Sequence, residues 1–182
     1  WSIDHIKEQR GTVHEFEEAK NTIEEKLKES IQLQSISDVP IGCFLSGGID
    51  SSLIATLMQN NSSQPINTFT VGFEEEGYNE ANYAREIAKK IGSNHNEISV
   101  TSREAQEVVP LLSSIYDEPF SDVSQIPSYL ISKLAKRHVT VVLSGDAGDE
   151  LFGGYNRYRF APSLWAIIRL VPITLRKLIF NI

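Results

Sequence analysis

Residues 46–52 could do chemistry: they read Ser-Gly-Gly-Ile-Asp-Ser-Ser directly after the apolar run 40–45. A buried strand that leads through such a turn into a helix predicts an anion site, because the first helical N–H groups lie at the positive end of the helix dipole. Two glycines let the backbone approach a phosphate closely, and serine hydroxyls add donors. The residues expected to hold the anion are Ser46, Gly47, Gly48, Ser51 and Ser52.

Asp50 indicates which anion this turn would bind. Its carboxylate would repel a bare phosphate but suits one that carries Mg²⁺, since this ion prefers carboxylate and phosphate oxygens. The chain has no G-x-x-x-x-G-K-[ST] sequence, which argues against a P-loop kinase or GTPase. The alternative without a ligand is a glycine-rich turn in which Asp50 is only a helix-start acid.

A second stretch, residues 144–155, reads Ser-Gly-Asp-Ala-Gly-Asp-Glu-Leu-Phe-Gly-Gly-Tyr and follows the β-branched run 139–143. Its acids Asp146, Asp149 and Glu150 lie within five residues, and clustered carboxylates repel one another. They are therefore either helix-start acids, which the helix dipole favours, or part of a metal site that faces Asp50.

The elements that must position these residues alternate between strand and helix. Apolar periodicity and Gly or Pro breakers predict helices over 15–33, 51–59, 79–91, 101–115 and 123–137, and strands over 40–45, 66–71, 95–100 and 139–143. Gly92 is expected to end a helix, and Thr101 with Glu104 to begin one as a capping box. This order predicts an α/β fold, a doubly wound, mostly parallel sheet with helices on both faces and ligands beyond the carboxyl ends of its strands. Asp50 and Asp149 can share a metal only if the strands over 40–45 and 139–143 are parallel neighbours.

Composition narrows the function classes. The 182 residues hold 17 Lys plus Arg and 24 Asp plus Glu, a formal charge of −7 that argues against nucleic acid as a partner. The single cysteine, Cys43, lies in an apolar run, which excludes an intrachain disulfide and favours a small buried side chain in a reducing cytoplasm. The apolar tail 160–182 contains Pro162 and Pro172 and predicts an amphipathic helix that packs on further protein, or an interfacial anchor, but no membrane span. Because the chain starts at Trp1 without Met, we expect it to be cut from a longer protein.

The Ser-Gly-Gly-x-Asp-Ser-Ser string resembles the pyrophosphatase loop of the N-type ATP pyrophosphatases, which include asparagine, GMP, NAD and argininosuccinate synthetases. With Asp117-Glu118-Pro119-Phe120 and Asp122 upstream and Gly153-Gly154-Tyr155 downstream, the second stretch looks like the synthetase domain of glutamine-hydrolysing asparagine synthetases. The resemblance implies a truncated adenine nucleotide α-hydrolase-like fold. It divides the chain into an interdomain linker (1–14), an ATP pyrophosphatase domain (15–159) and the start of an incomplete helical part (160–182).

The resemblance also implies roles for single residues. Those implied to contact the adenosine part of ATP, largely through main chain, are Leu45, Val71, Ser144 and Gly145. The serines and glycines of 46–52 would hold pyrophosphate, and Asp50 and Asp149 would share Mg²⁺. Asp146, where the family commonly has Glu, would handle ammonia or the adenylated intermediate. Ala147 stands where the family usually has Gly, so its Cβ carries a penalty if that position requires a positive φ.

The activity implied is adenylation of a carboxylate, first of all the aspartate side chain, with release of pyrophosphate. Ammonia from glutamine, made by an N-terminal glutaminase domain of the parent chain, would then give asparagine and AMP. The alternatives are another acceptor, as in a β-lactam synthetase or a polysaccharide-cluster amidotransferase, or a non-catalytic ATP-binding module. A homodimer stays open, and neither nucleic acid nor membrane is expected as a partner.

Three further signals are weaker. His95 beside Glu97 is either a nucleotide-site group or, as the more common case, a structural histidine. Residues 74–76, three glutamates after a strand, indicate a solvated loop or an amino-group or metal contact. The aromatic and basic alternation over 155–159 favours packing with phosphate contacts over nucleic-acid binding, given the charge of −7.

Overall fold

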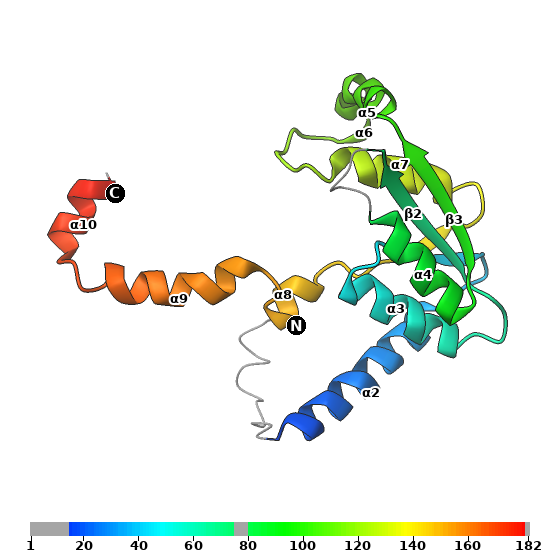
Figure 1. Cartoon of the computed structure of the whole chain (residues 1–182), viewed down its shortest axis with the longest axis horizontal. Coiled ribbons are helices and arrows are strands. Elements are labelled where there is room, and N and C mark those ends of the chain that lie inside the picture. The colour runs from blue at the N-terminus through cyan, green and yellow to red at the C-terminus, as the bar shows by residue number, and fades with distance from the viewer. Residues whose placement is uncertain (1–14, 75–79, 181–182) are drawn as a thin grey trace. The chain divides into compact units, whose positions relative to one another are not determined.

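The computed structural model describes residues 15–74 and 80–180, which belong to two compact units (Figure 1). The first unit extends to Ser144 and the second begins at Gly145. The predicted linker 1–14 lies outside the described residues, as do Asn79 and the second and third glutamates of 74–76. The predicted domain bounds at 14/15 and 159/160 stay a prediction.

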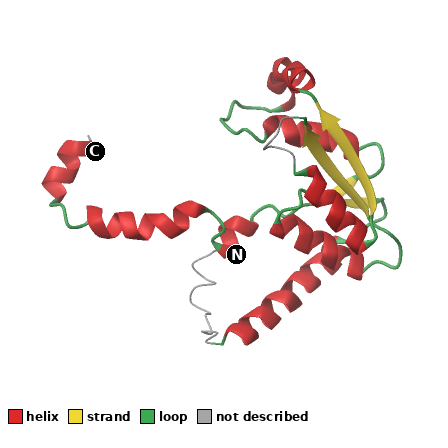
Figure 2. Cartoon of the chain, in the orientation of Figure 1, coloured by secondary structure: helices red, strands yellow, loops and turns green. Residues whose placement is uncertain are grey.

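A four-stranded parallel sheet forms the centre of the first unit. Figure 2 colours strands yellow, and two long ones are in clear view. Its strands are β1 (Ile41–Phe44), β2 (Asn67–Phe73), β3 (Asn94–Val100) and β4 (Val141–Leu143). They lie in the order β3-β2-β1-β4, with Cys43 opposite Thr68 on one side and Leu143 on the other. The alternating α/β fold, and the parallel pairing of the strands predicted over 40–45 and 139–143, are therefore confirmed.

Helices cover both faces of the sheet. The chain order of the helices in this unit is α2 (Phe16–Gln34), α3 (Ile49–Asn60), α4 (Ala81–Ile91), α5 (Ser102–Val108), the 3-10 helix η1 (Val109–Leu111), α6 (Leu112–Ile115) and α7 (Gln125–Ala135). Because side chains of a strand alternate between faces, Cys43 and Leu45 enter one core and Phe44 borders the other. The first core adds residues of α2, α3 and α4, and the second joins Phe69 to α7.

Local sequence explains several helix ends. Gly92 ends α4 at φ +74°, the left-handed conformation that glycine adopts without strain. Thr101 and Glu104 form the expected capping box at the start of α5. The continuous helix predicted over 101–115 is wrong, however: α5 passes through η1, which contains Pro110, into α6. Proline has no backbone N–H and disfavours a helical residue before it, which accounts for the interruption.

In the described part of the second unit, helices are the only regular elements: α8 (Gly148–Phe152), α9 (Asn156–Ile168) and α10 (Ile173–Phe180). The tail that we expected to form an amphipathic helix is divided at 169–172, directly before α10, where Pro172 disfavours continuation of α9. Among the described residues, no helix is long and apolar enough to cross a membrane.

Removal of the capping box should destabilise the first unit measurably. The Thr101 hydroxyl accepts from the Glu104 amide at 3.2 Å and donates to Glu104 Oε2 at 2.8 Å. We expect Thr101→Ala to lower the free energy of unfolding by about 1 kcal/mol, measured by urea denaturation. The matched control is Ser113→Ala on exposed α6, which should change it by less than about 0.5 kcal/mol. Equal losses in the two variants would contradict the role of the cap.

Candidate functional site

The turn between β1 and α3 is shaped by close contact with α4. Gly47 has φ +89°, and a Cβ there would lie 2.7 Å from the Tyr83 Cβ and 2.8 Å from the Ala84 amide nitrogen. Any side chain at this position would therefore be both strained and in collision with helix backbone. Only glycine at position 47 allows the turn to approach α4 this closely, and sequence patterns did not reveal this contact.

The serine hydroxyls of the turn form hydrogen bonds within the turn. Ser51 Oγ, which is buried, accepts from the Ser46 amide at 3.2 Å, pairs with Ser46 Oγ at 3.0 Å and donates to the Gly48 carbonyl at 3.3 Å. Ser52 Oγ donates to the same carbonyl at 2.6 Å, and Ser46 Oγ accepts from the Gly48 amide at 3.2 Å. The hydroxyls thus hold the loop in shape, and their contact with a phosphate stays a prediction.

Backbone N–H groups supply the anion-binding potential of this turn. Gly48 is the N-cap residue of α3 and offers no side-chain cap, while the Ser52 amide already donates to the Gly48 carbonyl at 3.1 Å. The first N–H groups of a helix have no acceptor within it, so those of the first turn of α3 point out of the helix end. Asp50, half-buried, is the acid of that turn. An anion with a bound cation would meet both donors and a carboxylate here.

The residues predicted to contact adenosine lie around the carboxyl ends of β1, β2 and β4. Leu45 is buried, its amide donates to the Phe69 carbonyl at 2.9 Å, and its carbonyl accepts from the Thr70 hydroxyl. Only the second lone pair of this carbonyl is left on its main chain for a ligand. Val71 is half-buried in β2, opposite Ile98. The nucleotide contacts themselves stay a prediction.

Ser144 leaves the sheet at the same edge as the turn after β1. It follows Leu143, the last residue of β4, whose register partner in β1 is Cys43. The chain moves from β1 towards β2 and β3 and then returns to place β4 on the other side of β1. Such a reversal of strand order opens a crevice outside the carboxyl ends of the strands, where α/β proteins bind ligands. We expected both Ser-Gly turns to lie at this edge. For the serines that begin them, Ser46 and Ser144, this is confirmed.

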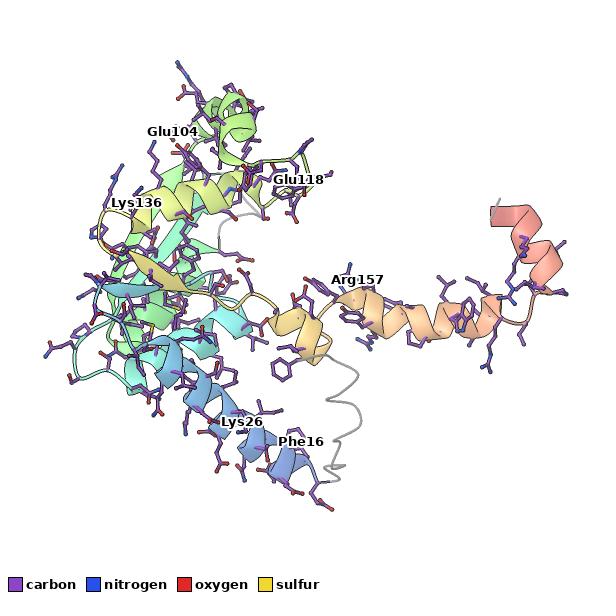
Figure 3. The ribbon with its side chains drawn as sticks, turned by 180° about the vertical axis from the view of Figure 1, so that it is seen from behind. Phe16, Lys26, Glu104, Glu118, Lys136 and Arg157 are labelled. Atoms are coloured by element: carbon purple, nitrogen blue, oxygen red, sulfur yellow. The ribbon has the colours of Figure 1, made fainter. Side chains whose placement is uncertain are left out.

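The loop before α7 adds residues at this edge that we used only as part of a motif. Pro119 to Val123, with Gln125, line a hollow of about 530 Å³, and Figure 3 labels Glu118 nearby. Gln125 Nε2 donates to the Phe120 carbonyl at 2.6 Å and to the Asp122 carbonyl at 3.1 Å. Hydrogen bonds from the side chain of Ser124 and from its backbone amide, the latter at 2.7 Å, lower the pKa of the Asp122 carboxyl below its usual value. Spacing alone gave no sign of this hollow.

The second acidic stretch lies in the second unit. Ala147 precedes α8 at φ +72°, a conformation that non-glycine residues rarely adopt, so the position does require a positive φ. Asp149 and Glu150 occupy the first turn of α8. The carbonyl of Gly145 accepts a hydrogen bond from the Gly148 amide at 3.2 Å. The Mg²⁺ site of Asp50 and Asp149, and the role of Asp146, stay predictions. Within each unit, the described His, Cys, Asp and Glu side chains form no group of three that could hold a metal.

The aromatic and basic residues after α8 make packing contacts. The Tyr155 hydroxyl donates to Glu150 Oε1 at 2.6 Å, which raises the pKa of Tyr155 to about 12 and lowers that of Glu150. The guanidinium of Arg157, labelled at the start of α9 in Figure 3, lies 4.2 Å from the centre of the Tyr155 ring. This arrangement supports the packing interpretation of the stretch 155–159.

His95 lies near the opposite edge of the sheet, at the amino end of β3. Its Nδ1 pairs with the Thr68 hydroxyl at 3.0 Å, and its buried Nε2 lies 3.7 Å from Glu97 Oε2. Glu97 also accepts from Arg85 of α4 at 2.7 Å. The histidine therefore joins β3 to β2, while Glu97 of β3 is joined to α4 by Arg85, which supports the structural interpretation. The glutamate run 74–76 was another weak signal. Its first residue, Glu74, follows β2, and the Glu74 amide donates to the Val100 carbonyl at 3.3 Å.

Residues 22–180 match the family model described as asparagine synthase. The chain is 39% identical over 160 residues to asparagine synthetase [glutamine-hydrolyzing] 1 of Bacillus subtilis, covering 88% of this chain and 25% of that protein. It is 34% identical over 158 residues to the human asparagine synthetase [glutamine-hydrolyzing], covering 82% of this chain and 28% of the relative. The chain thus spans about a quarter of the length of these relatives.

Among solved structures, NMN synthetase from Francisella tularensis is similar at a TM-score of 0.51 and 17% identity, over 76% of this chain and 59% of that one. At this identity the likeness concerns the fold alone, which is the adenine nucleotide α-hydrolase-like fold.

Glycine at position 147 should relieve strain. A residue with a Cβ costs about 1–2 kcal/mol in the left-handed conformation, and glycine recovers this less the roughly 0.5–1 kcal/mol of extra chain entropy. We expect Ala147→Gly to raise the free energy of unfolding by about 0.5–1 kcal/mol in denaturant titrations. The same exchange at Ala166, inside α9, should instead lower it by about 1 kcal/mol. Destabilisation by both exchanges would contradict the strain.

Acid should weaken the first unit through His95. Burial lowers the pKa of His95, and the Glu97 carboxylate offsets this in part. The folded state therefore favours the neutral ring, so stability is full above the unfolded-state pKa of about 6.5 and falls as pH drops below it, by at most about 1.4 kcal/mol per pH unit. We expect His95→Gln to flatten this slope in unfolding measured from pH 7.5 to 5. The exposed His138, changed to Gln, is the control, and a flattened slope there instead would show that the assignment is wrong.

Proposed function

Because the chain belongs to the asparagine synthase family, we propose that it forms the ATP-binding part of a ligase that converts a carboxylate into an acyl-adenylate, from which ammonia then displaces AMP. The observation that carries the proposal is the turn between β1 and α3. It combines a glycine pressed against α4, hydroxyls that hold the loop, and an uncapped helix end at the reversal of strand order. These are the features that a pyrophosphate group of a nucleotide requires.

Binding would begin with ATP in the crevice outside β1 and β4. The N–H groups of the first turn of α3 would hold the β- and γ-phosphates, with hydroxyls of Ser46 and Ser52 reoriented towards them. Held in this way, the pyrophosphate leaves the α-phosphorus exposed to in-line attack by a carboxylate. Adenosine would lie along Leu45, Val71, Ser144 and Gly145.

Asp50 fits a role towards Mg²⁺. It is a half-buried carboxylate on the helix turn that would hold the phosphates, and carboxylate oxygens are hard ligands suited to this ion. Asp149 is proposed as its partner. When bound, Mg²⁺ would neutralise charge on the departing pyrophosphate. Asp50 and Asp149 would hold it there, while the α3 amides orient the phosphate oxygens.

Aspartate is the acceptor that we propose first, since the relatives are named asparagine synthetases, with ammonia from a glutaminase domain, as their names indicate glutamine hydrolysis. Asp146 would then act on ammonia or on the acyl-adenylate. The strained Ala147, next to this shorter acid, favours the second candidate: the same chemistry on another carboxylate. An ATP-binding module without turnover is the third.

The test is pyrophosphate release by the complete protein that contains this chain, supplied with ATP, Mg²⁺, ammonia and aspartate. We expect Asp50→Asn to slow release by at least about 100-fold, the scale on which one preorganised electrostatic group acts. Asp38→Asn, the same exchange at an exposed residue before β1, should leave the rate unchanged.

The acceptor is tested in the same assay. Release that requires aspartate supports asparagine synthesis, whereas release that proceeds equally with other carboxylates and ignores aspartate favours the second candidate. ATP binding without release, whatever the carboxylate, would leave only the binding module.

A further inference from the structure

Two neighbouring glycines end α8, and they serve different purposes. Gly153 has φ +70°, and its amide donates to the Asp149 carbonyl, as does the amide of Gly154 at 3.0 Å. A Cβ on Gly153 would meet no atom closer than Tyr158 Cδ2 at 4.0 Å. Gly153 is therefore demanded by backbone conformation and not by space.

Gly154 shows the opposite case. Its φ lies outside the left-handed region, so an L-residue would adopt its backbone conformation without that strain. A Cβ there, however, would overlap Oδ1 of Asp149 and lie 2.9 Å from its Cγ and 3.3 Å from its Cα. Glycine at 154 thus leaves the space that the Asp149 carboxylate occupies.

The other acid of this helix turn is held elsewhere. Glu150 accepts from the Tyr155 hydroxyl at 2.6 Å, and the Tyr155 ring is covered by the Arg157 guanidinium at 4.2 Å. Adjacent carboxylates that could compete for one cation are therefore separated: Glu150 turns to Tyr155, and Asp149 lies against the backbone of Gly154.

We propose that Gly154 is a positioning residue for Asp149, whose carboxylate keeps its place only because position 154 carries no side chain. The proposal rests on the proposed function, in which Asp149 holds Mg²⁺. A methyl group at 154 would collide with the end of a short, rotatable side chain. The least costly response is rotation of Asp149 about its Cα–Cβ bond, with α8 left intact. The variant would therefore bind Mg²⁺ less tightly but fold as the wild type does.

The test compares Gly154→Ala with Gly153→Ala in the complete protein, by the Mg²⁺ concentration that gives half-maximal pyrophosphate release and by melting temperature. We expect Gly154→Ala to raise the Mg²⁺ midpoint at least about 10-fold, as loss of metal-orienting groups does, with a nearly unchanged melting temperature. Gly153→Ala should lower the melting temperature through backbone strain and leave the midpoint unchanged, because a Cβ at 153 comes near no atom of the Asp149 carboxylate.

A double-mutant cycle identifies the route of the effect. If Gly154 acts through Asp149, the pair Asp149→Asn and Gly154→Ala should be no worse than Asp149→Asn alone, so the two effects are strongly non-additive. Additive losses, or an unchanged midpoint in Gly154→Ala beside a raised one in Asp149→Asn, would overturn the proposal. An unchanged midpoint in Asp149→Asn would instead remove the metal role from the proposed function.

A crystal structure of the Gly154→Ala protein gives a readout that needs no activity. We expect the Asp149 carboxylate to leave its present rotamer while the helical turn of α8 and the Tyr155 to Glu150 hydrogen bond persist. A carboxylate that stays in place, with the backbone shifted in its stead, would overturn the proposal even if the wild-type protein released no pyrophosphate.

Discussion

Strand β1 is paired on both sides, and the crevice depends on this constraint. It lies between β2 and β4, both parallel to it, so all the turns that leave its carboxyl end and theirs emerge at one edge. Its side chains are shared between two cores, with Cys43 and Leu45 on one face and Phe44 on the other. A strand buried in this way cannot slip by one residue without exchanging its faces, and the turn after it is therefore held in register.

The turn that follows combines rigidity with open donors. Ser51 is buried and joins the two ends of the loop, while Gly47 lies in contact with α4. The loop thus keeps its shape through its own hydroxyls, and backbone N–H groups at the start of α3 are left for an anion. A preformed cradle of this kind loses little conformational entropy when a ligand arrives, which favours affinity.

Sequence reasoning predicted what short-range chemistry determines. Thr101 with Glu104 and the helix stop at Gly92 are local signals, and the apolar run 139–143 was recognised as a strand without knowledge of its partner. The break near Pro110 was missed, because periodicity alone extended the helix. Contacts across space could not be foreseen: a pattern does not reveal that Gly47 meets α4, or that Gly154 accommodates Asp149.

The position of His95 illustrates the same limit on the functional side. A histidine two residues from a glutamate has the appearance of a catalytic pair in one dimension. In three dimensions it lies at the amino ends of β2 and β3, with Thr68 and Glu97 as partners, at the edge opposite the crevice. The strand predicted over 95–100 already began at His95, and β3 differs from it by one residue. What the pattern could not show was the contact across space with Thr68 of β2.

The burial of Cys43 has a practical consequence for experiments on this chain. The side chain is fully enclosed in the centre of β1, its environment raises the pKa of the thiol to about 12, and the sequence holds no other cysteine. Thiol reagents are electrophiles that react with the thiolate as nucleophile, so the folded chain is close to inert towards them. Alkylation of Cys43 therefore reports opening of the central strand. A cysteine introduced on the surface would be the only residue of the folded chain that a thiol-reactive fluorescent label modifies.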